Sequence, residues 1–394
     1  MAIKNNQTFC GPAGLSIKNV SGRIAVKNVF AWFAGSRIYY THKARVAIKH
    51  ACNLSGLDNG GEILVPSYNC GSELDPLAKS GAHLVPYRVD KRCLIDLDDA
   101  QLKVTSKTKA LYITHYFGFP QPLNEIKQFC KINNLYLLED CALALFSDAD
   151  DVKLGTVGDV SFFSFVKTLP TLDGGALIVN NPKLFKASWK LTGISFKSLI
   201  RRSLSLLKSG LLRWSPLSTK IYSLYLEHTR EKEFSRLKNS PKKNKSLFPD
   251  MPDNYYFDET LINKAMSAVT KYMMKRFDFE EIINRRRNNY IHLLNRLSGN
   301  PRINILFSKL PAGVCPLVFP IIVSKRDEVC AMLNQQAIDA TAWWAGYYNG
   351  LDWAKYPDAC FLKNNLIALP IHQDLSLSDL DFIAEKLILI MDKI

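Results

Sequence analysis

Apolar runs and helical patterns alternate along residues 62–179 of the chain. Six short apolar runs have the length and spacing of strands, at 62–65, 83–89, 109–115, 135–139, 160–165 and 176–179. Helical spacing of apolar residues occurs between them at 71–80 and 123–134, and upstream at 43–54. Nearly continuous apolar strands separated by helices are typical of a largely parallel sheet covered on both faces. The pattern therefore predicts an α/β fold.

The remainder of the chain has a different pattern. Polar and apolar residues alternate irregularly from 189 to 248, and a long helix is predicted over 258–295. A strand at 317–323, a helix at 327–336 and an amphipathic helix at 376–392 follow, the last with Ser376 or Ser378 near its cap. We therefore expect a large domain over 1–250, with an insertion at about 186–250. A connecting helix and a small α/β domain would occupy 251–394.

Size and composition favour a well-packed protein. The chain has 394 residues, of which 47% are apolar, enough for a substantial core. We see no signal-peptide pattern at the N-terminus and no apolar run long enough to span a bilayer. The nine cysteines are scattered without metal-ligand spacing. We expect a cytoplasmic protein with free thiols and no metal site.

The positive charge is concentrated in the insertion. Residues 183–245 contain sixteen Lys or Arg and three acidic residues, so nearly all of the net charge of +15 lies there. A helical cover with solvated cations is the interpretation we favour. Contact with an anionic membrane surface, or with the phosphates of a substrate, remains open. Nucleic acid is the least favoured partner, because no recognition motif accompanies the charge.

Candidate chemistry lies at the ends of two predicted strands. Asp140 follows the strand at 135–139, and Lys167 follows the one at 160–165 with Gly174-Gly175 after it. Ligands bind at the carboxyl ends of strands in open α/β sheets. An Asp that holds a ring nitrogen protonated and a Lys that forms a Schiff base are what pyridoxal phosphate requires. Ser164 could donate a hydrogen bond to its phosphate. Taken singly, each residue also suits a turn or a surface.

Ordered motifs strengthen this interpretation. They read KARVA at 43–47, VPSYNC at 65–70, HYFG at 115–118, EDCA at 139–142, FSFVKTLPTLDGG at 163–175 and LPIHQDLS at 369–376. In this order the motifs resemble the DegT/DnrJ/EryC1/StrS family of pyridoxal-phosphate-dependent sugar aminotransferases. The resemblance covers roughly residues 36–185 and 255–394. It implies the type I fold of aspartate aminotransferase, in which a large domain with a mostly parallel sheet carries a small C-terminal α/β domain.

The resemblance also implies roles for residues. Lys167 would form the Schiff base and move the proton, and Asp140 would pair with the ring nitrogen of the cofactor. Ser164 and the backbone amides of Ala44 and Arg45 would hold the phosphate, as a helix N-terminus favours an anion.

Other positions are less typical. Cys70 matches the aromatic residue that stacks on the ring. His115 lies in the active-site loop, where a structural role is favoured over substrate contact. Ala44 stands where the family usually has Gly, and Leu143 where it has the Gln or His that contacts the cofactor.

The expected function is transfer of an amino group from an amino acid, with glutamate as the expected donor, to a nucleotide-linked keto-sugar for surface polysaccharide or amino-sugar synthesis. The family resemblance further implies a homodimer. A sugar dehydratase on the same fold is an alternative, although that class has His in place of the lysine. A non-catalytic binding or regulatory protein is another, kept open by Cys70 and Leu143.

Overall fold

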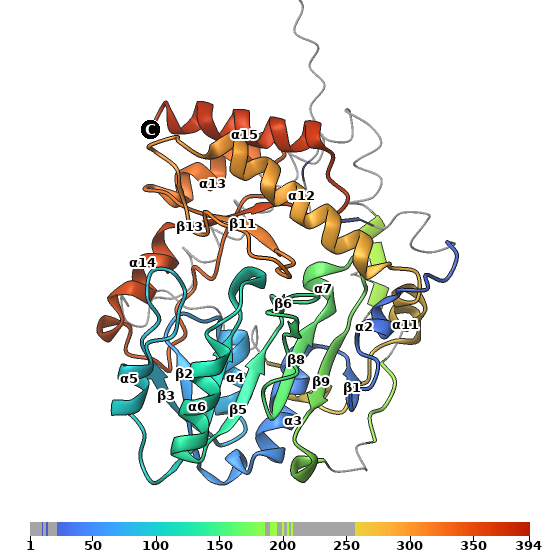
Figure 1. The fold of residues 1–394 in the computed structure, drawn as a ribbon, viewed down its shortest axis with the longest axis vertical. Coiled ribbons are helices and arrows are strands. Elements are labelled where there is room, and N and C mark those ends of the chain that lie inside the picture. Colours follow the sequence, from blue (N-terminus) through green and yellow to red (C-terminus); the bar gives the residue numbers. More distant parts are fainter. Residues whose placement is uncertain are drawn as a thin grey trace, which may run out of the picture.

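The computed structural model describes residues 10, 13, 14, 22–185, 190–194, 199, 200, 203, 204, 206, 207 and 257–394. A seven-stranded sheet, with strand order β1-β9-β8-β5-β4-β2-β3, forms the larger part of the fold (Figure 1). Its strands are β1 (Ile38–Thr41), β2 (Glu62–Pro66), β3 (His83–Tyr87), β4 (Thr108–Thr114), β5 (Tyr136–Asp140), β8 (Val160–Ser164) and β9 (Gly175–Val179). Strands β3, β2, β4, β5 and β8 run parallel, whereas β9 is antiparallel to β8 and β1. The predicted α/β fold with a mostly parallel sheet is confirmed.

Short helices connect these strands. They include α2 (Val29–Trp32), α3 (Ala44–Leu54), α4 (Gly71–Ala78), α5 (Leu97–Leu102), α6 (Leu123–Asn133) and α7 (Phe165–Thr168), with single 3-10 turns at Leu57–Asn59, Tyr116–Gly118 and Pro182–Leu184. A small hairpin, β6 (Asp148–Ala149) and β7 (Val152–Lys153), lies after β5. The predicted strand at 160–165 is one residue too long, because Phe165 already begins α7.

A second sheet lies in the C-terminal part. Strands β10 (Asn304–Ile305), β11 (Val318–Ile322), β13 (Leu366–Pro370) and β12 (Thr341–Ala342) pair antiparallel in that order. Helices α12 (Phe279–Leu297), α13 (Arg326–Gln335), α14 (Pro357–Asn365) and α15 (Leu377–Met391) belong to this part, where α12 and α15 pack together (Figure 1). Ser376 caps α15 as expected, since its side chain accepts a hydrogen bond from the Asp379 amide.

The long helix predicted over 258–295 is wrong. The segment divides into a 3-10 turn at Glu259–Leu261 and two helices, α11 (Ala268–Met274) and α12. A further 3-10 turn, Trp353–Lys355, lies outside this segment, before α14. Ser267 caps α11 and Asp278 caps α12 through side-chain hydrogen bonds to first-turn amides. Each cap starts a new helix, so the segment is not one continuous helix.

The predicted insertion lies almost wholly outside the described residues, and the domain boundary at 250 stays a prediction. All nine cysteines lie within the described residues and are free thiols. No helix in the described parts of the chain is long and apolar enough to cross a membrane.

Candidate active site

Asp140 is the last residue of β5 and is 1% exposed. The Tyr112 hydroxyl donates a hydrogen bond to Asp140 Oδ2 at 2.7 Å, and the Ala142 amide donates to Oδ1 at 2.7 Å. Burial raises the pKa of Asp140, while the positive charge of Lys167 and these two hydrogen bonds act to lower it. A buried carboxylate in this position gains from any cationic group bound beside it.

Lys167 follows the neighbouring parallel strand. Strands β5 and β8 pair directly, so Asp140 and the short helix α7 that carries Lys167 lie at the same edge of the sheet. The Lys167 side chain is exposed and lines a cavity, together with Arg286, Trp343 and His372 from the C-terminal part. Its Nζ lies 5.8 Å from the ring centroid of Trp344. Residues far apart in the sequence therefore line this cavity together with the lysine.

Gly175 lies beside two of the predicted phosphate-binding residues, Ser164 and Ala44. Ser164 and Gly175 are paired in the β8–β9 register, and Ser164 is 6% exposed. A Cβ atom on Gly175 would lie 2.4 Å from the Ala44 nitrogen, so β9 packs directly on the start of α3. Backbone amides at the start of a helix have no acceptor within the helix. The Arg45 side chain points elsewhere, because its Nη2 donates to Ser72 Oγ at 2.9 Å.

Several buried polar atoms around this edge have no hydrogen-bond partner among the described residues. They are Asn69 Oδ1, Glu73 Oε1, Thr114 Oγ1 and Thr171 Oγ1. Thr114 pairs with Asp140 in the β4–β5 register, and Thr171 lies in the segment after Lys167. Buried polar atoms are rarely left unpaired without a reason. The residues present thus fit a polar ligand with several heteroatoms, as pyridoxal phosphate is.

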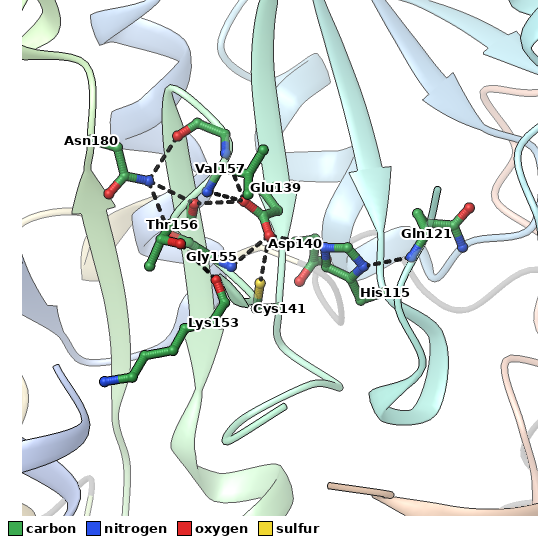
Figure 2. Close-up of polar contacts among 12 residues, drawn as sticks. His115, Gln121, Glu139, Asp140, Cys141, Lys153, Gly155, Thr156, Val157 and Asn180 are labelled. Carbon is green, nitrogen blue, oxygen red and sulfur yellow. Dashed lines mark hydrogen bonds and ion pairs between the residues drawn. The ribbon is translucent and has the colours of Figure 1, made fainter. Parts of the chain in front are cut away.

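His115 is fully buried and both of its ring nitrogens are engaged (Figure 2). Nε2 lies 3.0 Å from Glu139 Oε1, and Nδ1 accepts a hydrogen bond from the Gln121 amide at 3.0 Å. This arrangement favours the structural role over contact with a substrate.

Glu139 organises the loop behind Asp140 (Figure 2). Its carboxylate accepts hydrogen bonds from the amides of Gly155, Val157 and Gly158 as well as pairing with His115. Burial acts to raise the pKa of Glu139, but these hydrogen bonds outweigh it and the pKa is lowered. The ligand atoms of His115, Glu139 and Cys141 lie within 4.8 Å of one another. Hydrogen bonds already occupy both carboxylate oxygens, so we assign this cluster a structural role.

Two positions that differ from the family pattern lie close to the site. Cys70 is the N-cap of α4, directly after the loop that follows β2. Leu143 is 1% exposed and follows the Asp140 turn. Neither side chain offers a charged group to a cofactor.

No pattern in the sequence singled out Tyr112, Glu73, Lys363 or Trp344. Lys363 is fully buried and donates to the carbonyls of Asn69, Trp344 and Gly346 at 2.8, 3.0 and 2.8 Å. Trp344 packs on Tyr68 with the ring centroids 5.4 Å apart. These contacts join segments that are remote in sequence, so no local pattern indicated them.

Residues 28–205, slightly less than half of the chain, match the sequence profile of the DegT/DnrJ/EryC1/StrS aminotransferase family. The predicted family resemblance is confirmed. It rests on the part of the chain that contains Asp140, Ser164 and Lys167.

Curated relatives are similar over part of their length. GDP-perosamine synthase of Vibrio cholerae is 32% identical over 139 residues, which cover 34% of this chain and 38% of that protein. The dTDP-4-dehydro-2,3,6-trideoxy-D-glucose 4-aminotransferase of Saccharopolyspora spinosa is 32% identical over 151 residues, covering 38% and 39%. The chain thus matches less than half the length of these relatives.

Solved structures show the same fold over nearly the whole chain. The aminotransferase TlmJ of Streptoalloteichus hindustanus has a TM-score of 0.63 at 20% identity, covering 95% of this chain and 90% of that one. PseC of Helicobacter pylori, an aminotransferase involved in the biosynthesis of pseudoaminic acid, has a TM-score of 0.65 at 15% identity, covering 98% and 100%. The DegT/DnrJ/EryC1/StrS family profile thus matches the site-bearing region, and the fold of these aminotransferases extends to the C-terminal part.

Proposed function

We propose that this chain is a pyridoxal-phosphate-dependent aminotransferase that moves an amino group from an amino acid, with glutamate as the expected donor, to the ketone of a nucleotide-linked sugar. The observation that carries the proposal is the placement of Asp140 and Lys167 at or just after the ends of two adjacent parallel strands, with Lys167 lining a cavity. The match of residues 28–205 to the aminotransferase family supports it.

Each site residue has a task in this proposal. Bound pyridoxal phosphate supplies an electron sink for chemistry at the carbon that carries the amino group. Asp140 pairs with the ring nitrogen and keeps it protonated. Ser164 and the amides of Ala44 and Arg45 would hold the phosphate, and Lys167 would hold the cofactor and move a proton at Nζ.

Products of such a reaction would serve surface polysaccharide or amino-sugar synthesis, as the names of relatives indicate for those proteins. A homodimer and a cytoplasmic location belong to the proposal as well, and peripheral membrane contact of the basic insertion stays an alternative to a helical cover with solvated cations. Flotation with anionic vesicles, comparing the full chain with one lacking residues 190–250, tests the membrane contact.

The main experiment compares the native protein with Lys167→Ala and the control Lys355→Ala, whose side chain is exposed on a 3-10 turn. After addition of pyridoxal phosphate, we expect a visible absorbance from the lysine-bound cofactor in the native and control proteins only. Addition of amino acids from a panel should abolish this absorbance and release the corresponding 2-oxo acid. Transamination that persists in Lys167→Ala would overturn the proposal. Absence of the absorbance in native protein would favour the non-catalytic alternative.

One relative, GDP-4-keto-6-deoxy-D-mannose 3-dehydratase of Yersinia pseudotuberculosis, is 28% identical over 129 residues. The dehydratase alternative predicts dehydration of a keto-sugar in place of its amination. Product analysis by mass spectrometry separates the two reactions.

A further inference from the structure

Trp344 lies beside Lys167 and has an uncommon backbone conformation. Lys167 Nζ lies over the Trp344 ring, 5.8 Å from its centroid, a distance at which the face of an indole attracts a cation. The φ angle of Trp344 is +48°, in the left-handed region that residues other than glycine rarely adopt. Backbone of this kind persists where the surrounding contacts impose it, and it is concentrated at binding and catalytic sites.

A buried ammonium group holds the loop that contains Trp344. Lys363 on α14 is fully buried, and its Nζ donates to the Trp344 carbonyl at 3.0 Å. The same group donates to the carbonyls of Gly346 and Asn69, each at 2.8 Å. An ammonium group has three N–H donors, and each has a carbonyl here. The loop of Trp344 is therefore fixed to the loop that precedes α4.

The Trp344 indole itself packs on two tyrosines. Its ring centroid lies 5.4 Å from that of Tyr68, which follows β2, and 5.8 Å from that of Tyr116, which follows β4. Both tyrosines are buried and their rings stack on each other, whereas Trp344 is only half-buried. The indole is thus supported by rigid neighbours and keeps part of its surface accessible beside Lys167.

We propose that Trp344 is a binding residue whose indole forms an aromatic wall for a planar, cationic ring held at Lys167. Among aromatic side chains, indole attracts cations most strongly, and contacts between rings stabilise by more than their buried area alone. In the proposed function Asp140 keeps the ring nitrogen of the cofactor protonated, so the ring carries the charge that an indole face favours. Lys363 is a positioning residue, which acts through Trp344.

The inference deepens the proposed function and rests on it for the identity of the ring. The contact between Trp344 and Lys167 is a property of the protein without cofactor, so it can be tested separately. Trp32 provides a matched control, because Lys153 Nζ lies 4.6 Å from the centroid of its ring. The Trp32 ring packs on Phe146 and Phe279.

The first measurement uses full-length, cofactor-free protein whose lysines carry 13C-methyl groups added by reductive methylation, which retains their positive charge. An indole ring moves the resonance of a methyl group over its face upfield. In native protein we expect upfield methyl resonances for Lys167 and Lys153, assigned by their absence from Lys167→Arg and Lys153→Arg. Trp344→Leu should return only the Lys167 resonance to the position of exposed lysines such as Lys355, and Trp32→Leu only that of Lys153.

The second measurement is absorbance titration with pyridoxal phosphate. We expect Trp344→Leu to lower the affinity about two- to tenfold, the range typical of aromatic pairs. Trp344→Phe, which keeps a ring, should retain most of the native affinity, and Trp32→Leu all of it. Native affinity in Trp344→Leu, or equal losses in Trp344→Leu and Trp32→Leu, would overturn the inference.

The methyl resonances separate the two possible failures. A Lys167 resonance that is not shifted in native protein, or that keeps its shift in Trp344→Leu, would overturn the inference whether or not the protein binds the cofactor. Absence of the lysine-bound cofactor from native protein would instead overturn the proposed function, and the Lys167 resonance would still decide the Trp344 contact.

Lys363→Met tests the positioning role, since Met has a similar length and no N–H donors. We expect it to weaken both the upfield shift of Lys167 and the affinity for the cofactor. Added to Trp344→Leu, it should cause no further loss of affinity, because effects that act through one contact are not additive. Additive losses in the double variant would show that Lys363 does not act through Trp344.

Discussion

The hydroxyl of Tyr112, in the middle of β4, donates a 2.7 Å hydrogen bond to the carboxylate of Asp140 at the end of β5. This bond favours the charged form of Asp140, whose pKa burial would otherwise raise further. Tyr112→Phe removes the donor and keeps the ring. Because hydrogen bonds to charged groups contribute about 1.5–3 kcal/mol, we expect affinity for pyridoxal phosphate to fall at least about tenfold. Absorbance titration with the cofactor measures it.

Tyr87→Phe is the control for that prediction. The Tyr87 hydroxyl is equally buried and donates to the Tyr112 carbonyl at 2.9 Å, but it does not reach Asp140. This variant should lose some stability and retain its affinity for the cofactor. Equal affinity losses in both variants would show that general loosening of the sheet, not the Asp140 contact, is responsible.

Glu139 should be a determinant of stability. Glu139→Gln replaces an acceptor oxygen by an amide group that faces the N–H donors of Gly155 or Gly158. Breaking such a buried, charged network costs about 3 kcal/mol or more. Urea unfolding followed by circular dichroism measures the change. A loss below about 0.5 kcal/mol, the range of ordinary surface substitutions, would contradict this role.

The same residue predicts a pH dependence of stability. Against the opposing effect of burial, hydrogen bonds lower the pKa of Glu139 below its ordinary value of 4.5. The carboxylate therefore contributes fully above about pH 4.5, and its contribution is lost as the pH falls through the lower, folded-state pKa. The difference in unfolding free energy between native protein and Glu139→Gln should shrink as the pH falls below that point. A constant difference would exclude titration of Glu139 as its cause.

The strand ends explain why the sequence could place Asp140 and Lys167 at the same edge of the sheet. Asp140 and Lys167 each follow an apolar run, and the parallel pairing of β5 and β8 places them together. The single helix predicted over 258–295 was wrong because Asp278 caps a separate helix within that range. Periodicity records which face is buried, not where a helix is interrupted.

Contacts between distant segments could not be predicted from the sequence. The local sequence around Lys363 indicates only a polar position on a short helix. In the structure, its ammonium group is buried and donates hydrogen bonds to the carbonyls of Asn69 and Gly346, in two other segments. Glu73 reads as an ordinary first-turn acid, and only the fold shows that Asp140 and Lys167 act on it. Burial of a charged residue depends on what packs over it, and this information is not local.

Gly175 provides the last prediction, on the phosphate end of the site. A Cβ atom there would lie 2.4 Å from the Ala44 nitrogen and 2.5 Å from the Lys43 carbonyl carbon. Gly175→Ala should therefore push the start of α3 away from Ser164. Overpacking of this kind costs about 1–3 kcal/mol, so we expect affinity for pyridoxal phosphate to fall about tenfold. Pyridoxal, which lacks the phosphate, should bind with nearly unchanged affinity.

Gly193→Ala is the matched control, because a Cβ atom at Gly193 has no neighbour within 4 Å among the residues that the structure describes. Its affinities for both compounds should equal those of native protein in the same absorbance titration. If Gly175→Ala lowered the affinity for pyridoxal as much as the affinity for pyridoxal phosphate, the substitution would have displaced the ring site and not the helix start. The assignment of Ser164 and the Ala44 amide to the phosphate would then be wrong, since only contacts to the phosphate distinguish the two ligands.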